Sequence, residues 1–89
     1  MDRESLIQAL SPNISTTINR MPSRWLEINS IQVNTWRRLI SEGKPRQATR
    51  RFINTVDASE SWDTFIDYAC PSAIASKYRD YSDGYSSDY

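Results

Sequence analysis

The chain has 89 residues, no histidine and one cysteine, and its 11 basic and 11 acidic side chains give a net charge of zero at pH 7. A Cys/His zinc cluster is excluded, and two glycines are too few for a Gly-rich phosphate loop. No apolar run approaches the ~20 residues that span a bilayer. The single cysteine, Cys70, cannot form an intrachain disulfide, so we expect one small domain in a reducing cytoplasm.

The residues before Pro22 predict two short helices. Leu6 and Leu10 share one helical face, and the Ser11-Pro12 pair ends this first helix. Ser11 can cap the second helix and Pro12 suits its first position. The apolar residues expected to face inward are Leu6, Ile7, Leu10, Ile14, Ile18 and Met21.

A connector and a third helix follow Pro22. Trp25 and Leu26 lie in the connector, and we expect both to plug the core. Asn29 or Ser30 can cap the third helix, which ends near Gly43, a residue suited to the left-handed conformation. The residues expected to point inward from this segment are Ile28, Ile31, Trp36, Leu39 and Ile40.

The fourth and fifth helices have the clearest periodicity. Pro45 is placed near the first position of the fourth helix, and residues 57–59 form a turn whose Ser59 can cap the fifth. Apolar residues recur in both at the spacing of one helical face. The expected inward residues are Ala48, Phe52, Ile53 and Val56 in the fourth helix and Trp62, Phe65, Ile66 and Ala69 in the fifth.

A break at residues 70–72 precedes a sixth helix carrying Ile74, Tyr78 and Tyr81. Short connections make neighbouring helices roughly antiparallel, so residues 1–81 predict an all-α, six-helix antiparallel bundle. Residues 82–89 are polar and low in complexity, and we expect a disordered tail or linker there. The carboxylates flank helical stripes instead of converging in the sequence, so we do not expect an enzyme, a cofactor or a small-molecule substrate.

Basic and acidic residues are sorted along the sequence. Residues 20–51 have eight basic side chains against two acidic ones, a balance of +6, whereas residues 52–89 have two against seven, a balance of −5. A chain with a positive and a negative half is complementary to a second copy, or to a relative built in the same way. The sorting therefore predicts protein–protein assembly.

Three segments resemble the caspase recruitment domain (CARD) of the death-fold superfamily, especially the CARDs of RNA-sensing antiviral helicases and of the mitochondrial antiviral-signalling adaptor. INRMP at residues 18–22, running into Trp25-Leu26, resembles the end of their second helix and its connector. Gly43 followed by RQAT at 46–49 and FINTV at 52–56 resembles their glycine turn and fourth helix. SWDTFIDYA at 61–69 resembles their fifth helix.

The resemblance implies homotypic CARD–CARD assembly, with itself or with another CARD-containing protein, into an oligomer or a helical filament. It suggests a signalling adaptor in innate antiviral immunity, with an apoptotic caspase-recruitment adaptor or inhibitor as the alternative. The chain would be a CARD-only protein or the N-terminal domain of a longer one. The resemblance implies a basic face of Arg37, Arg38, Lys44, Arg46, Arg50 and Arg51 and an acidic face of Asp57, Glu60, Asp63 and Asp67.

A small helical nucleic-acid-binding domain is the alternative of a different class. Arg50 and Arg51 beside Phe52 could contact phosphates, and the tyrosines of the C-terminal segment resemble a stacking series. The net charge of zero and the acidic second half oppose binding to a phosphate backbone. We therefore expect no direct nucleic-acid contact and no membrane contact by this domain.

Overall fold

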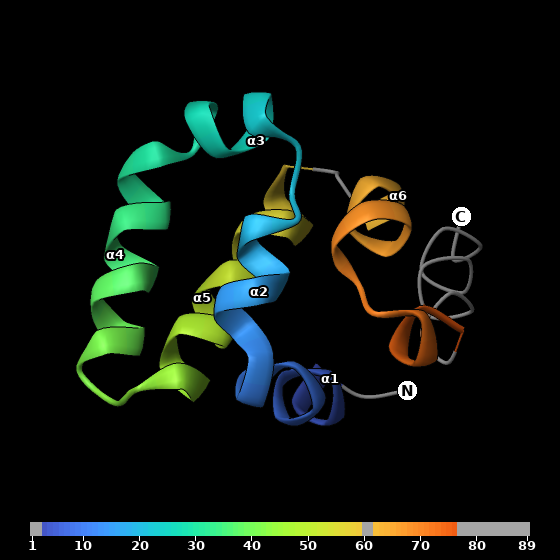
Figure 1. The fold of residues 1–89 in the computed structure, drawn as a ribbon, viewed down its shortest axis with the longest axis horizontal. Coiled ribbons are helices and arrows are strands. Elements are labelled where there is room, and N and C mark those ends of the chain that lie inside the picture. The colour runs from blue at the N-terminus through green and yellow to red at the C-terminus, as the bar shows by residue number, and fades with distance from the viewer. Residues whose placement is uncertain (1–2, 60–61, 77–89) are drawn as a thin grey trace.

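The computed structural model describes residues 3–59 and 62–76, and all regular structure in these residues is helical. Residues 72–76 are helical after a break at residues 70–71. The named elements, in chain order, are α1 (Arg3–Leu10), the 3-10 turn η1 (Ser11–Asn13), α2 (Ile14–Asn19), α3 (Ser23–Ile28), α4 (Ser30–Ser41), α5 (Pro45–Ala58), α6 (Trp62–Thr64) and its wider π-helical continuation η2 (Phe65–Ala69) (Figure 1).

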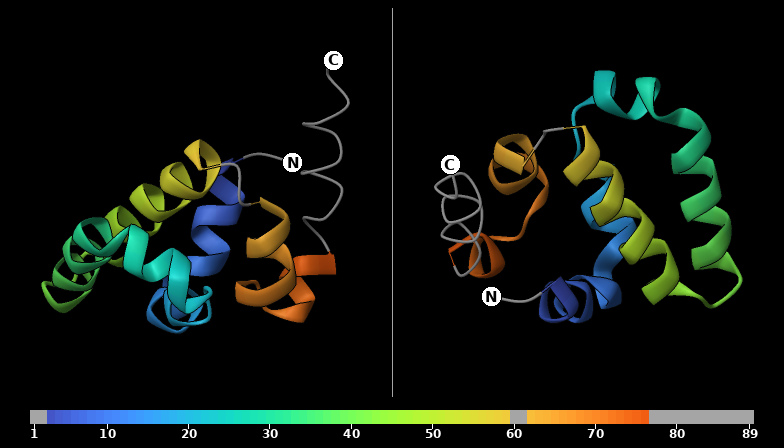
Figure 2. Two further views of the ribbon diagram at one scale, coloured as in Figure 1. Left: turned by 90° about the horizontal axis from the view of Figure 1, so that it is seen from above. Right: turned by 180° about the vertical axis from the view of Figure 1, so that it is seen from behind.

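Helix α5 is the central element of the fold. It contacts α1, η1, α2 and α4, and α2 in turn contacts η2. Seen from the front and from behind, α4 lies on one side of α5 and α6 on the other (Figures 1 and 2). The described chain is therefore an all-α bundle, as the sequence predicted. The predicted sixth helix lies partly within it, while Tyr78, Tyr81 and residues 82–89 lie outside the described residues.

A Schellman motif reverses the chain between α4 and α5. Gly43 has φ of +78°, and its N–H donates to the carbonyl of Ile40 at 3.1 Å, while the N–H of Lys44 donates to Leu39 at 2.9 Å. These two bonds satisfy carbonyls left over at the end of a helix, and glycine adopts the left-handed conformation without a Cβ penalty. Pro45 then begins α5. The predicted role of Gly43 is confirmed.

A series of aromatic rings runs through the core from α3 to η2. Trp25 stacks on Trp36 with centroids 6.1 Å apart, and Phe52 meets Trp36 edge-on at 5.4 Å. Phe65 lies 5.7 Å from Phe52 and 5.5 Å from Trp62. Edge-to-face pairs of this kind add to the burial energy of the rings. Every inward residue predicted for the fourth and fifth helices is buried, as is Cys70.

The predicted inward positions of Ile28 and Ile31 are wrong. Ile28 is 71% exposed and Ile31 is 78% exposed, whereas Val33 is buried. Val33 and Trp36 form the inner face of α4. Ile31 is two positions before Val33, which corresponds to a rotation of about 200° around the helix axis, so Ile31 points outward. The segment containing Trp25 is also a helix, α3, and not an irregular connector, although Trp25 packs against the core as expected.

Two polar residues predicted to cap helices, Ser11 and Asn29, instead donate to backbone carbonyls. The Ser11 hydroxyl donates to the carbonyl of Ile7 at 2.6 Å, because the backbone continues from α1 into η1 without leaving helical geometry. The Asn29 side chain donates back to the carbonyl of Trp25 at 2.9 Å. The predicted turn at 57–59 is mostly the last turn of α5, where the Ser59 hydroxyl donates to Val56 at 3.3 Å.

Candidate interaction surfaces

The six residues of the predicted basic face lie on one helical hairpin. Arg37 and Arg38 are on α4, Lys44 is in the turn, and Arg46, Arg50 and Arg51 are on α5. All six are exposed. We call α4, α5 and the turn at residues 42–44 the basic hairpin (Figure 1).

An acidic residue from α1 reaches into the basic hairpin. One carboxylate oxygen of Glu4 accepts a bond from Arg46 at 3.0 Å, and the other accepts one from Arg50 at 2.8 Å. At least half of each of these three side chains is exposed, and exposed pairs contribute about 0–1 kcal/mol. Glu4 therefore does little for stability but offsets one positive charge of the hairpin.

The other cations of the hairpin carry weaker internal contacts. Arg37 donates to the Asn19 side-chain oxygen at 3.0 Å and pairs with no carboxylate of residues 3–59 and 62–76, and Lys44 lies 3.8 Å from Glu42. Within the described part of the chain, Arg38 and Arg51 form no ion pair. These exposed cations are the part of the predicted basic face that remains open to a partner.

Asp57, predicted on the acidic face, instead joins α1, α5 and α6. Its Oδ2 accepts a bond from Arg3 at 2.5 Å, and its Oδ1 accepts one from the indole N–H of Trp62 at 2.7 Å. Arg3 also donates to Asn54 at 2.7 Å. Burial alone would raise the pKa of Asp57, but the bonds from Trp62 and Arg3 and the charge of Arg3 together lower it. The carboxylate is therefore charged and structural at neutral pH.

Two other residues of the predicted acidic face are carried by α6 and its continuation η2. Asp63 on α6 and Asp67 on η2 are both exposed, and Tyr68 beside them is 66% exposed. We call Asp63, Asp67 and Tyr68 the acidic edge. Glu60 lies outside the described residues. Helix α4 of the basic hairpin and the α6–η2 segment that carries the acidic edge lie on opposite sides of α5 in the views from the front and from behind (Figures 1 and 2).

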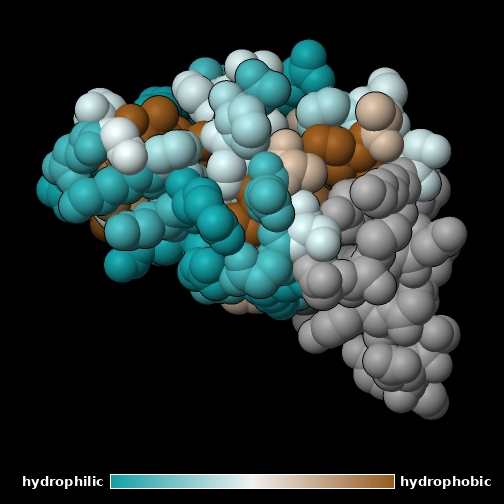
Figure 3. All heavy atoms as spheres, turned by 90° about the horizontal axis from the view of Figure 1, so that it is seen from below, coloured by the Kyte–Doolittle hydropathy of each residue, from teal (hydrophilic) through white to brown (hydrophobic). Residues whose placement is uncertain are grey.

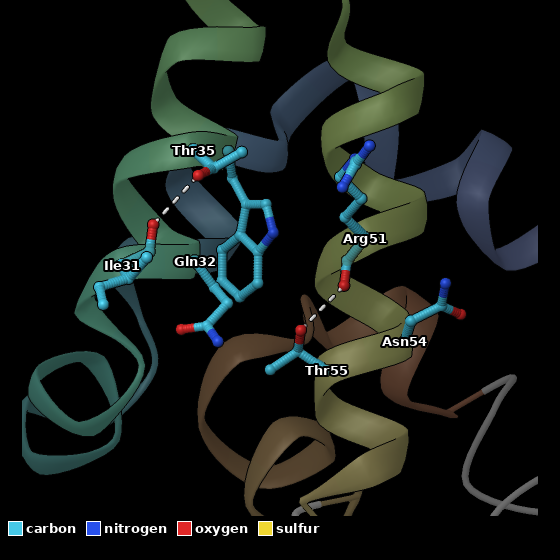
Figure 4. Close-up of a pocket in the computed structure, with 7 residues that line it drawn as sticks. Ile31, Gln32, Thr35, Arg51, Asn54 and Thr55 are labelled. Atoms are coloured by element: carbon cyan, nitrogen blue, oxygen red, sulfur yellow. Dashed lines mark hydrogen bonds between the residues drawn. The ribbon is translucent and has the colours of Figure 1, made fainter.

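A shallow groove of about 290 Å³ lies between α4 and α5. Sequence reasoning gave no sign of it, because it depends on how two helices pack. Figure 4 shows residues of α4 on one side of the groove and residues of α5 on the other. Its lining residues are Ile31, Gln32, Thr35, Trp36, Arg51, Asn54 and Thr55.

Apolar residues do not form one large exposed face in the view from below, where small hydrophobic patches lie among hydrophilic side chains (Figure 3). The large exposed apolar side chains of the described residues are Ile28, Ile31 and Tyr68. Ile31 lines the groove, Tyr68 belongs to the acidic edge, and Ile28 is the last residue of α3. Isolated exposed apolar residues are ordinary, but Ile31 and Tyr68 coincide with the charged surfaces.

The described residues contain no group of three or more carboxylates or thiols arranged to hold a metal ion. None of their helices has both the length and the apolar character needed to cross a membrane. Comparisons with protein-family models, with curated proteins and with solved structures return no match for this chain. The resemblance to CARDs therefore depends on the residue patterns of the three segments described above.

Proposed function

We propose that this chain is a CARD-like helical module that acts by assembling with itself or with another CARD-containing protein, as a non-enzymatic adaptor in cytoplasmic antiviral signalling. The observation that supports this most is that the exposed cations are carried by α4, α5 and the turn between them, whereas the acidic edge is carried by α6 and η2, a separate part of the bundle. Two such surfaces on one body can meet between neighbouring copies, and a contact of two different surfaces leaves each end open for another copy.

The strength of such an assembly depends on several contacts acting together. A single exposed ion pair contributes about 0–1 kcal/mol, so each step needs several pairs together with apolar contact. Opposite surface potentials speed the encounter of two copies, and added salt screens them. Assembly is therefore expected to rise with protein concentration and to fall with salt.

The test compares the size of the purified protein across concentrations by light scattering, at low and moderate salt and without nucleic acid. We expect the wild type to form oligomers, and Arg51→Glu and Asp63→Arg each to weaken them. An equal mixture of the two variants contains one intact cationic surface and one intact acidic surface, so it regains paired species. Arg20→Glu is the matched control, because Arg20 is exposed but lies outside the basic hairpin.

The nucleic-acid alternative gives a different result in the same experiment. The exposed cations of the basic hairpin would then bind labelled RNA while the protein stays monomeric, with affinity falling steeply as salt rises. A wild-type protein that stays monomeric at every concentration would refute the assembly proposal. An RNA complex formed by that monomer would establish the alternative.

A further inference from the structure

The groove between α4 and α5 combines an apolar rim with a cation. Ile31, 78% exposed, stands at its α4 side, and the guanidinium of Arg51 has no ion pair among the described residues. Thr35 and Thr55 donate their hydroxyl protons to carbonyls of their own helices, at 3.1 Å each, as the dashed lines in Figure 4 show. Their hydroxyl protons are therefore used, and the groove offers the exposed side chain of Ile31 and the charged donor of Arg51 beside the side-chain amides of Gln32 and Asn54.

The acidic edge has the complementary chemistry. Tyr68 exposes an aromatic ring, and Asp63 supplies a carboxylate with no ion pair within the described residues. A tyrosine side chain has an apolar body and a polar end, which suits a site with one wet side and one apolar side. Arginine donors bind carboxylates well because the guanidinium and the carboxylate match in charge and shape.

One copy of the chain does not bring these two surfaces together. α4 and η2 lie on opposite sides of α5 and α2 in the views from the front and from behind (Figures 1 and 2). The ring that occupies the groove must therefore come from a neighbouring molecule. Each copy would offer its own groove at one side and its own Tyr68 at the other.

We infer that the groove between α4 and α5 is the receiving site for Tyr68 of a second copy, with Asp63 of that copy paired to Arg51. This inference rests on the proposed assembly and specifies where its contact lies. The ring of Tyr68 packs against Ile31 at the rim, and the carboxylate of Asp63 neutralises the cation of the groove. Buried aromatic anchors of this kind carry most of the energy of small interfaces.

The test uses variants that change the proposed anchor and the groove while keeping every charge. Tyr68→Ala removes the ring, and Tyr68→Phe keeps it. Gln32→Trp places a large side chain in the groove, and Gln8→Trp places the same side chain on the exposed surface of α1. Circular dichroism and urea unfolding check that each variant is folded. The readout is the concentration of half-assembly by light scattering.

We expect Tyr68→Ala and Gln32→Trp to raise the concentration of half-assembly by about tenfold or more, and Tyr68→Phe and Gln8→Trp to leave it within about twofold. Wild-type assembly with all four variants unchanged would overturn the groove contact while leaving the proposed function intact. The same holds if Gln8→Trp impairs assembly as much as Gln32→Trp. A monomeric wild type would overturn both.

Discussion

Helices α4 and α5 lie side by side and have similar lengths, 12 and 14 residues, yet they are buried to different degrees. α4 has more large apolar residues than α5, but the only buried ones are Val33 and Trp36. α5 buries Ala48, Thr49, Phe52, Ile53 and Val56. α5 has neighbours on several sides, whereas the contacts of α4 are mainly with α5. In this bundle, the number of packing neighbours of a helix, more than its apolar content, therefore determines how much of it is buried.

The largest expected effect comes from removing the central ring of α5. Phe52 is fully buried and contacts the rings of Trp25, Trp36 and Phe65, so Phe52→Ala should lower the free energy of unfolding by about 3–5 kcal/mol. Leu39→Ala on α4 should cost clearly less, because Leu39 is only partly buried. Urea unfolding measures both. Equal losses would contradict the contrast between the two helices.

The next largest effect on stability is expected at Asp57, a polar residue of α5 that contacts α1 and α6. Asp57→Asn keeps an acceptor for the indole of Trp62 but removes the charge that pairs with Arg3. We expect a loss of about 1–3 kcal/mol in the free energy of unfolding at pH 7. Asp63→Asn is the matched control, since Asp63 is exposed and is expected to have little effect on stability.

The Asp57 contribution depends on pH in a defined direction. The folded pKa of Asp57 lies below its usual value, so its stabilising effect is fully present above the unfolded pKa of about 3.9. The effect is lost as the pH falls through the folded pKa. The difference in stability between wild type and Asp57→Asn should therefore shrink between pH 5 and strongly acidic pH. A difference that stays constant over this range would contradict the assigned role.

A smaller effect is expected where the contacts of α5 are exposed to solvent. Glu4→Gln removes the charge that pairs with both Arg46 and Arg50 on the outer side of α5. The cost should be about 0–1 kcal/mol in the free energy of unfolding, and it should diminish as salt is added. Thermal unfolding at low and high salt measures it. A larger loss of unfolding free energy that does not change with salt would contradict this, because it would mean that the Glu4 pairs stabilise the fold as strongly as the Asp57 contacts.

The smallest expected effect lies on the outer face of α4. Ile31→Ser should change the free energy of unfolding by no more than about 0.5 kcal/mol, because Ile31 is exposed. Val33→Ser, two residues away, is the matched control and should destabilise strongly, because Val33 is buried. Urea unfolding of these two variants shows which face of α4 points toward the core. Equal effects would show that its inner face is assigned wrongly.

The sequence predicted the helical class and the inner faces of its most periodic segments. Phe52, Phe65 and their helical neighbours follow the 3.6-residue repeat. Gly43 was predictable because it closely follows the apolar residues of a helix and is the residue type that readily adopts a positive φ. Burial was wrongly predicted for Ile28 and Ile31, because apolar character alone does not determine which face of a helix at the edge of the bundle points inward.

The electrostatic contacts were less predictable from the sequence. Arg3 and Asp57 are 54 positions apart, and no local pattern indicates that they pair. Glu4 likewise reaches residues more than 40 positions away, so the sorting of charge along the sequence overstated the basic surface. The groove between α4 and α5 depends on the packing of two helices and on the exposed rotation of Ile31.

The burial of Cys70 makes it a natural reporter of motion. It is the sole thiol in the chain and is 7% exposed, at the junction between η2 and residues 72–76. Because little of Cys70 is exposed, its modification by a thiol-reactive reagent is slowed while that junction is closed, so the labelling rate of the untouched protein gives a lower bound on the free energy of local opening there. Labelling of the same sulfur under denaturing conditions supplies the reference rate. The bundle thus contains its own probe of how tightly the helical turns on either side of this junction stay closed.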